Sequence, residues 1–508
     1  MGHSVGQAFK KEINKDNITN TLSNVEKAEP QKITYPKRIF LIIGNEFCER
    51  FNFNGMKAIL ALYLKDKLGF TENDATVLFH TLVMMLYFTC IFGAILSDVW
   101  LGKFKIIVYL SILYAIGSTI ISIGVIPTIA ISPKIALYIG LIFIALGSGG
   151  IKSCVIALGG DQFKLPEQSE QMTTYFSMFY FTTHAGAFVS TLIIPILRSD
   201  IHCFGENVCY SLAFGVPALL MITAILLFIL GKSSYTYVQT SSENMLMQML
   251  KCIWNAMIVK RREGKTKPRE NLLDYSIETY GEQMVNETRI MLKILVLYLP
   301  VPFFWALHFQ TGSRWTFQAN KMNGDIQFYT IKPDQMQMIE SIFILTFIPL
   351  CELVIYPLLS KIGIRRPLQK LTIGGILMGI SFVLSAGVQY QIESMPLNSV
   401  NMLWQIPQYV FLTMGEAVLA VTGLSFSYEE APQSMKSVVL SFWYFEVALG
   451  NIILIFIAGL ELFESRTYEF LFFSVLMFCS MFVFAVLAYN YEKLKKTEKT
   501  SFQSRFIK

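Results

Sequence analysis

The sequence predicts an all-α, polytopic membrane protein with about twelve transmembrane helices in two bundles of six. Of its 508 residues, 53% are hydrophobic and only 15% are charged. A soluble protein usually carries about 25% charged residues, and apolar stretches of about 20 residues, long enough to cross a bilayer, recur along this chain. One long polar stretch near the middle separates six such segments from six others, and this arrangement favours two bundles.

Each expected span is an apolar stretch of helical length between polar loops. The spans are expected near residues 38–64, 75–100, 104–127, 134–155, 171–197, 209–231, 289–312, 334–359, 368–389, 402–425, 434–461 and 466–490. The first six form an N-terminal bundle, residues 38–231, and the last six form a C-terminal bundle, residues 289–490.

Three polar segments lie outside the bundles. Residues 1–37 are expected to form a disordered cytosolic tail and residues 491–508 a second cytosolic tail. Residues 232–288 form the polar linker, in which Met245–Val259 carries apolar residues at helical spacing. This segment predicts an amphipathic helix that lies on the membrane surface.

The loop charges predict the orientation. Basic residues concentrate in the linker and in the loops that follow even-numbered spans, and examples are Lys103, Lys361, Arg366, Lys436 and Lys493. Cytosolic loops carry an excess of lysine and arginine, so both termini and the linker are expected in the cytosol. The same charges do not distinguish the plasma membrane from an endolysosomal membrane.

The first span contains charges that a membrane helix rarely carries. Glu46, Glu49 and Arg50 lie on one helix face, and Lys57 follows two turns later. Each charge at a bilayer centre costs at least about 2.5 kcal/mol, so such residues usually face a cavity or a partner. The stripe therefore predicts part of a transport pathway, although an ion-pair knot that locks helices together is an alternative.

Several function classes lack support in the sequence. We find no metal-ligand spacing, no phosphate-binding glycine loop in context and no nucleophile motif, so neither an enzyme nor a metal or cofactor site is expected. The net charge of +6 is explained by cytosolic loops and does not require nucleic acid. Cys203 and Cys209 flank a short loop that should face outward, where a disulfide is plausible.

A series of short motifs resembles a known transporter family. The segment from Gly93 to Lys103 is similar to the loop signature of the major facilitator superfamily. Further motifs resemble those of the proton-coupled oligopeptide transporters. They are Glu46-x-x-Glu49-Arg50-Phe51, His80-Thr, Gly149-Gly-Ile-Lys152, Gly159-Gly-Asp-Gln-Phe163, Phe303-Phe-Trp305-Ala-Leu, Gly312-Ser-Arg-Trp315, Pro333-Asp-Gln-Met, Trp404-Gln-Ile-Pro-Gln-Tyr and Gly415-Glu416. The resemblance runs from about residue 37 to residue 490 and is strongest to animal members.

This resemblance implies a twelve-helix facilitator fold and symport of protons with di- and tripeptides, by one chain acting as a monomer in the bilayer. Protons are then the coupling ion, and no other cofactor is implied. Animal members usually carry a large outer domain between spans nine and ten. The loop from Gln391 to Asn401 is short, so this chain should lack that domain.

The resemblance also implies roles for individual residues. Arg50, Lys57 and Lys152 would supply a cationic pole for a zwitterionic peptide and Glu416 an anionic one. Lys152 and Glu416 would also form a salt bridge between the bundles that closes one gate. The aromatic residues that match pocket positions are Tyr63, Tyr87, Trp305 and Trp443.

Proton coupling and a second gate are implied in the same way. Glu46, Glu49 and His80 are the candidates for proton binding, because burial and neighbouring charges move the pKa of such groups. Lys293 in the seventh span and Glu352 in the eighth are similar to a charge pair on the cytosolic side of the family.

Three departures from the family pattern concern the substrate site. His184 and Glu340 stand where the family has asparagines, and Phe309 stands where it has a carboxylate that pairs with the first-helix base. Lys57 is therefore expected to lack a partner. We hypothesise that His184 and Glu340 meet across the bundle interface as a proton-sensitive gate.

These departures leave two alternatives to peptide import. The first is a transporter of another small anion or zwitterion on the same scaffold, and the second is a nutrient receptor that transports nothing. The retained charges Glu46, Glu49, Arg50, Lys152 and Glu416 favour a peptide symporter.

Overall fold

The described part of the chain is helical from its first residues to its last. The computed structural model describes residues 35–164, 167–237 and 244–506, so nearly all of the expected tail at residues 1–37 lies outside the described residues. Within these ranges, extended pairing is limited to isolated bridges between single residues. The predicted all-α fold class is confirmed.

The six helices of the N-terminal bundle begin and end close to the predicted spans. They are α2 (Ile39–Leu62), α3 (Glu72–Leu96), α4 (Lys103–Gly124), α5 (Pro133–Gly160), α6 (Ser169–Ser199) and α7 (Tyr210–Leu230). Short π-helical turns, η1 (Tyr63–Lys67) and η2 (Ser97–Leu101), continue α2 and α3, and a 3-10 turn, η3 (Gly231–Ser234), follows α7.

The C-terminal bundle contains more breaks. Its helices and turns are α9 (Ile277–Tyr298), α10 (Val301–His308), η5 (Phe309–Gly312), α11 (Arg314–Ala319), η6 (Pro333–Met336), α12 (Gln337–Leu350), η7 (Cys351–Ile355), α13 (Tyr356–Lys361), α14 (Pro367–Ser394), η8 (Met402–Gln405), α15 (Ile406–Glu430), η9 (Gln433–Met435), α16 (Lys436–Gly459) and α17 (Arg466–Phe506). The seventh span is bent by 48° between α9 and α10. Pro300 and Pro302 lie at this bend, where each removes a backbone N–H donor from the helix.

Helix length and composition support the predicted number of spans. Ten of the described helices are long and apolar enough to cross a membrane, and the bent α9–α10 segment makes eleven. Helix α2 carries Glu46, Glu49, Arg50 and Lys57 and is too polar for this criterion. It nevertheless packs along α6 and α7 inside the N-terminal bundle, and we count it as the twelfth span.

The linker differs in part from the prediction. Helix α8 (Met245–Glu263) covers the expected amphipathic segment, but its buried face packs on the protein, where Cys252 and Ala256 contact Leu273 and Val285. Its contact with a membrane stays a prediction. Helix α9 begins at Ile277, within the predicted linker, and α17 continues to Phe506, beyond the predicted end of the last span.

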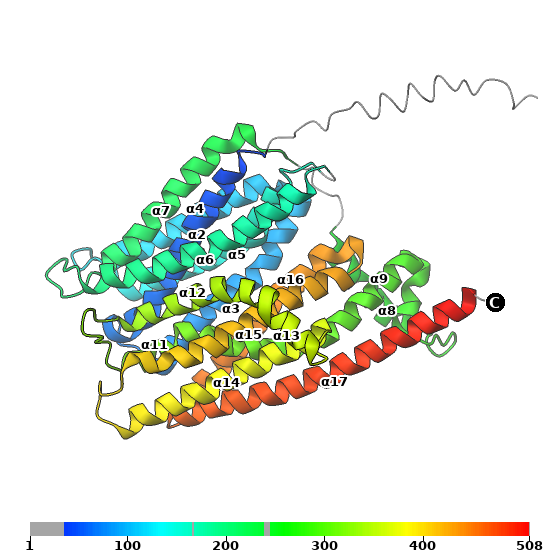
Figure 1. Ribbon diagram of the computed structural model, residues 1–508. Coiled ribbons are helices and arrows are strands. Elements are labelled where there is room, and N and C mark those ends of the chain that lie inside the picture. Colours follow the sequence, from blue (N-terminus) through cyan, green and yellow to red (C-terminus); the bar gives the residue numbers. More distant parts are fainter. Residues whose placement is uncertain (1–34, 165–166, 238–243, 507–508) are drawn as a thin grey trace, which may run out of the picture.

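The two bundles lie side by side, with α14 and α17 at the far edge of the C-terminal bundle (Figure 1). Helix α3 packs along α16, and α6 packs along α12, so each bundle contributes two helices to the central interface. Gly93 of α3 and Gly150 of α5 allow these two helices to approach closely, because a Cβ atom on Gly93 would collide with the backbone of Gly150.

The loops at one end of the molecule confirm two further predictions. Cys203 and Cys209 form a disulfide, with Cα atoms 5.3 Å apart. Helix α14 ends at Ser394 and η8 begins at Met402, so no folded domain is inserted between them. We call the end with the disulfide the outer end and the end with α8 the inner end, following the predicted orientation.

Candidate functional site

The charged residues of the first span form a compact buried cluster. The Arg50 Nε atom lies 2.6 Å from Glu46 Oε1 and 3.2 Å from Glu49 Oε2. Glu46 also accepts a hydrogen bond from Thr183, and Glu49 accepts one of 2.6 Å from Ser148. In this conformation Arg50 is held by its own helix, which is the arrangement that an ion-pair knot would have.

Lys152 lies next to this cluster on α5. Its ammonium donates a hydrogen bond of 3.1 Å to the Tyr87 hydroxyl and lies 4.4 Å from the centre of the Tyr87 ring. The predicted substrate residues Lys152 and Tyr87 are therefore brought together, at the face of the N-terminal bundle where Tyr87 contacts Phe309 and Tyr444 of the other bundle.

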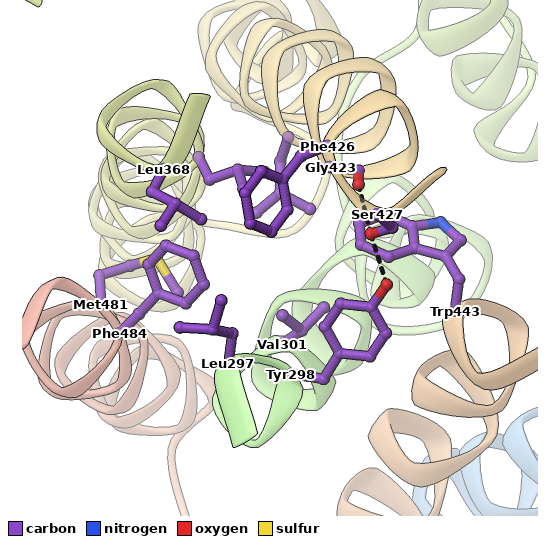
Figure 2. Close-up of a pocket in the computed structure, with 12 residues that line it drawn as sticks. Leu297, Tyr298, Val301, Leu368, Gly423, Phe426, Ser427, Trp443, Met481 and Phe484 are labelled. Carbon is purple, nitrogen blue, oxygen red and sulfur yellow. Dashed lines mark hydrogen bonds between the residues drawn. The ribbon is translucent and has the colours of Figure 1, made fainter. Parts of the chain in front are cut away.

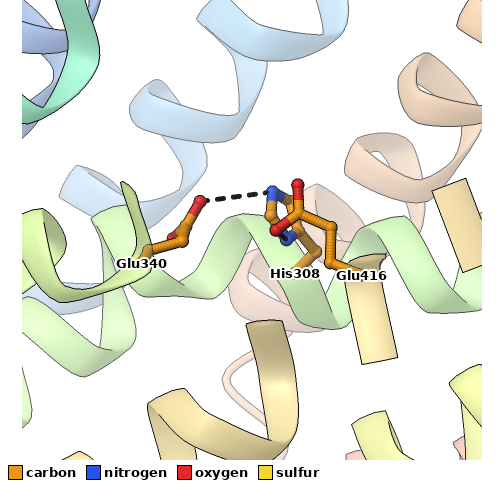
Figure 3. A group of neighbouring side chains, drawn as sticks. All are labelled: His308, Glu340 and Glu416. Atoms are coloured by element: carbon orange, nitrogen blue, oxygen red, sulfur yellow. Dashed lines mark ion pairs between the residues drawn. The ribbon is translucent and has the colours of Figure 1, made fainter. Parts of the chain in front are cut away.

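The C-terminal bundle presents an acidic group opposite these cations. His308 at the end of α10 lies between Glu340 of α12 and Glu416 of α15, as Figure 3 shows. The His308 Nε2 atom is 3.7 Å from Glu340, and its Nδ1 atom is 3.9 Å from Glu416. The two carboxylate side chains remain 19% and 14% exposed, so this group is not sealed in the protein core.

Lys57 lies next to Phe309, which replaces the family carboxylate. Its ammonium is 5.8 Å from the centre of the Phe309 ring, and it interacts electrostatically with Glu340 and Glu416. The expectation that Lys57 lacks a partner considered one position only. Two carboxylates of other helices face the same lysine.

The hypothesised pair of His184 and Glu340 is also wrong for this conformation. Glu340 makes its ion pair with His308, while the His184 ring packs 4.6 Å from the ring of Tyr180 on its own helix. His184 nevertheless interacts electrostatically with Arg50 and with His308, so it does face the interface between the bundles.

The predicted aromatic residues separate into two groups. Trp305 packs edge-to-face on His308, at 5.5 Å, and on Trp443, at 6.3 Å, so both tryptophans flank the acidic group. Tyr63 is 1% exposed and packs on Tyr210 and Phe214 of α7. That position is the core of the N-terminal bundle, which does not support a role in substrate binding.

His80 joins the bundles directly. Its Nδ1 atom donates to the Asn451 side-chain oxygen at 2.7 Å, and its Nε2 atom lies 2.9 Å from the Ser313 hydroxyl. The amide of Asn451 is oriented by its own bond to Val447, so its oxygen is the atom that faces His80. Both ring nitrogens are thus engaged by the C-terminal bundle in this conformation.

Polar contacts that sequence reasoning missed hold the outer ends of the bundles together. Arg198 of α6 makes a bidentate ion pair with Asp334 of η6, at 2.8 and 3.1 Å, and Asp334 is fully buried. Asn73 of α3 accepts hydrogen bonds from Arg314 and Arg466. The signal was present as Arg198 near the end of a span and as Asp334 in the Pro333-Asp motif.

The predicted salt bridge of the inner gate is not formed. Lys152 bonds to Tyr87, and no ion pair joins it to Glu416 among the residues that the structure describes. Hydrogen bonds between the described parts of the bundles gather at the outer end and at mid-height, so the outer ends of the bundles are joined. Likewise no described ion pair joins Lys293 to Glu352, which is exposed in η7, so that pair stays a prediction.

A second buried acid lies near a small cavity in the C-terminal bundle. The cavity has apolar walls and room for about one water, 10 Å³, and the Tyr298 hydroxyl beside it bonds to Ser427 (Figure 2). Glu446, one turn from Trp443, is 6% exposed and has one oxygen without a hydrogen-bond partner in the described structure. Its signal in the sequence was a lone acid inside an apolar span.

Taken together, the groups place positive charge on one bundle and negative charge on the other. Lys57 and Lys152 lie on the N-terminal side, and Glu340 and Glu416 lie on the C-terminal side. A zwitterion with separated termini matches these two poles, because each terminus finds an opposite charge.

Comparison with known proteins relates the chain to one transporter family. The family model described as "POT family" matches residues 104–463. Over 361 residues the chain is 50% identical to Peptide transporter family 1 of Drosophila melanogaster, covering 71% of this chain and 48% of that protein. It is 43% identical over 404 residues to Solute carrier family 15 member 2 of Rattus norvegicus, covering 76% of this chain and 55% of the relative. The chain thus spans about half the length of these relatives.

A solved structure shares the fold over nearly its full length. The POT family transporter PepTSo superposes with a TM-score of 0.80 at 28% identity, covering 91% of this chain and 99% of that one. Solute carrier family 15 member 2 of Danio rerio is 32% identical over 659 aligned positions, covering 90% of this chain and 91% of the relative. That alignment exceeds the 508 residues of this chain, so the relative contains segments that this chain lacks.

Proposed function

The chain belongs to the POT family, and we propose that it is a proton-coupled symporter that imports di- and tripeptides by alternating access. The observation that carries this proposal is the opposition of charges across the bundle interface. Lys57 interacts electrostatically with Glu340 and Glu416 of the other bundle, and Lys152 is bonded to Tyr87, whose ring contacts Phe309 and Tyr444 of that bundle. The peptide carboxylate would bind the lysines, and the peptide amine would bind the carboxylates.

Alternating access follows from competition at the poles. In the observed conformation Lys152 is bonded to Tyr87 and is free of Glu416. When substrate leaves, the two opposite charges attract across the gap and draw the inner ends together. The outer ion pair between Arg198 and Asp334 must then separate, because the bundles rock about the central site.

For proton coupling we propose the first-span cluster, with His80 as a second element. Glu46 and Glu49 share one guanidinium, so protonation of one carboxylate would loosen Arg50 toward a peptide carboxylate. We further propose that a monomer in the plasma membrane performs this cycle, with no cofactor other than the coupling proton.

The test is peptide uptake by the full chain in liposomes loaded with a pH-sensitive dye, with an acidic exterior. Neutral dipeptides should acidify the lumen, and the rate should fall as the outside pH rises. The Lys152→Gln variant should lose at least nine-tenths of this uptake, because the cationic pole is weakened. The matched control, Lys105→Gln, removes an exposed charge at the start of α4 and should transport normally.

Two results would contradict the proposal. Unchanged uptake by a folded Lys152→Gln variant would exclude the lysine as the substrate pole. Absence of uptake by the unmodified chain, with dipeptide binding also absent, would show that peptides are not its substrates. Binding without uptake would favour a receptor.

A further inference from the structure

The group formed by His308, Glu340 and Glu416 has a composition that transport of a peptide does not require. The three side chains come from α10, α12 and α15, and Figure 3 shows them directed toward one another. One ligand atom from each lies within 4.8 Å of the other two. One imidazole and two carboxylates, brought together from three separate helices, are a ligand set for a divalent transition metal.

The group also has unused bonding capacity. The His308 Nδ1 atom and the Glu416 Oε2 atom are buried and have no hydrogen-bond partner among the described residues. The side chain of His308 is only 8% exposed, and Nδ1 points to Glu416 at 3.9 Å. These separations are too long for hydrogen bonds, and the two ring nitrogens face different carboxylates, so a metal would bind one nitrogen and draw in the carboxylate that faces the other.

Lys57 does not bridge the two carboxylates. It interacts with both carboxylates electrostatically, but no ion pair within 4.0 Å joins its ammonium to either in the described structure. Two carboxylates close together in a partly buried site repel each other unless a cation lies between them. A small divalent cation supplies the charge at a position that the lysine does not occupy.

We propose that His308, Glu340 and Glu416 bind a divalent transition metal of the zinc class. Bonds of about 2.0–2.2 Å in a tetrahedron put ligand atoms about 3.4 Å apart, and the three ligand atoms lie within 4.8 Å of one another, so each pair must close by about 1.4 Å at most. Glutamate side chains can make this shift by rotation. Magnesium and calcium fit less well, because they prefer six or more oxygen ligands and no imidazole.

Three protein ligands would leave one position of a tetrahedron for a water molecule or the amine of a substrate. If the proposed function is correct, bound metal occupies the anionic pole and competes with the peptide amine. Metal binding itself does not depend on that function, so the two claims can fail separately.

The test is calorimetric titration of Zn²⁺ into the purified, chelator-treated full chain. We expect one saturable site, and we expect His308→Ala and Glu340→Gln each to weaken its affinity at least tenfold. His202→Asn is the matched control, since it removes an exposed histidine of the outer loop and should leave binding unchanged. Co²⁺ in place of Zn²⁺ should give a visible absorption band that disappears in His308→Ala.

Several outcomes would overturn the site: no saturable Zn²⁺ binding by the unmodified chain, binding that survives both ligand substitutions, or equal affinity for Mg²⁺. Melting temperatures measured without metal show whether each variant is folded. Zn²⁺ binding in a chain that moves no peptide would support the site and count against the proposed function. Peptide uptake without Zn²⁺ binding would do the reverse.

Discussion

The ion pair between Arg198 and Asp334 should set the conformational equilibrium of the molecule. It joins α6 of one bundle to η6 of the other through two hydrogen bonds of 2.8 and 3.1 Å. Asp334 is 0% exposed and Arg198 is 8% exposed. Under the proposed alternating access, opening of the outer side separates the two residues, so the interaction would belong to the inward-open state alone.

The Asp334→Asn substitution leaves the buried Arg198 without the carboxylate that it contacts directly. Breaking one partner of a buried pair typically costs about 3–5 kcal/mol, and at the lower limit the equilibrium between inward- and outward-open states shifts about 150-fold. The double variant Arg198→Gln/Asp334→Asn leaves no unpaired charge, so its effect should be much smaller than the sum of the single substitutions.

The assay is the distance between spin labels on the two bundles, introduced as unnatural amino acids at Ile131 and Leu397, which are both exposed. Asp334→Asn should populate a longer distance, and the double variant should restore most of the shorter one. The reasoning is refuted if Asp334→Asn gives the distances of the unmodified chain, or if the single effects add without coupling.

Three further predictions concern stability and pH. Gly93→Ala should lower the melting temperature in detergent, because overpacking α3 against Gly150 costs about 1–3 kcal/mol, while Gly387→Ala, which meets open space, should not. Replacing Cys203 and Cys209 together by serine should lower stability by roughly 2 kcal/mol, whereas Cys479→Ser, an exposed free cysteine, should have little effect. The Lys332 ammonium holds the pKa of Asp200 below its ordinary value. Their contact is therefore complete above the ordinary pKa of an aspartate and is lost as the pH falls through the lowered pKa. Asp200→Asn should therefore leave the pH profile of uptake between pH 5 and 7.5 unchanged, and a shifted profile would contradict this.

The sequence predicted the spans well, because membrane helices are defined by apolar length and loop charge, and both are local properties. The start of α9 was missed because the polar residues from Ile277 pack against α8, and tertiary contacts are not visible in hydropathy. The helix is also interrupted at Gly281, where φ is 81°. The end of α17 was missed for a related reason. Its polar last turns are held by Glu430, which pairs with Lys495 and Tyr491.

The site was predicted less completely than the fold. Residues were assigned one at a time from motif positions, so Lys152 and Tyr87 were each assigned to the substrate site without the contact that joins them. The sequence did not predict contacts that depend on how helices face one another. His308 was given no role from the sequence. Its position between Glu340 and Glu416 arises from three helices that are distant in sequence. Tyr63 matched a motif, yet its side chain faces α7.

The length of α17 has a practical consequence. Its 41 residues form a rod of about 60 Å, and Arg366 and Glu430 at the inner ends of α14 and α15 are tied to it through Glu492 and Lys495. The helix therefore tilts with its whole bundle, and the displacement is largest at its inner end. A 10° rocking about the outer end would sweep its tip by about 10 Å, so a fluorophore fused behind Phe506 would turn each transport cycle into an optical signal.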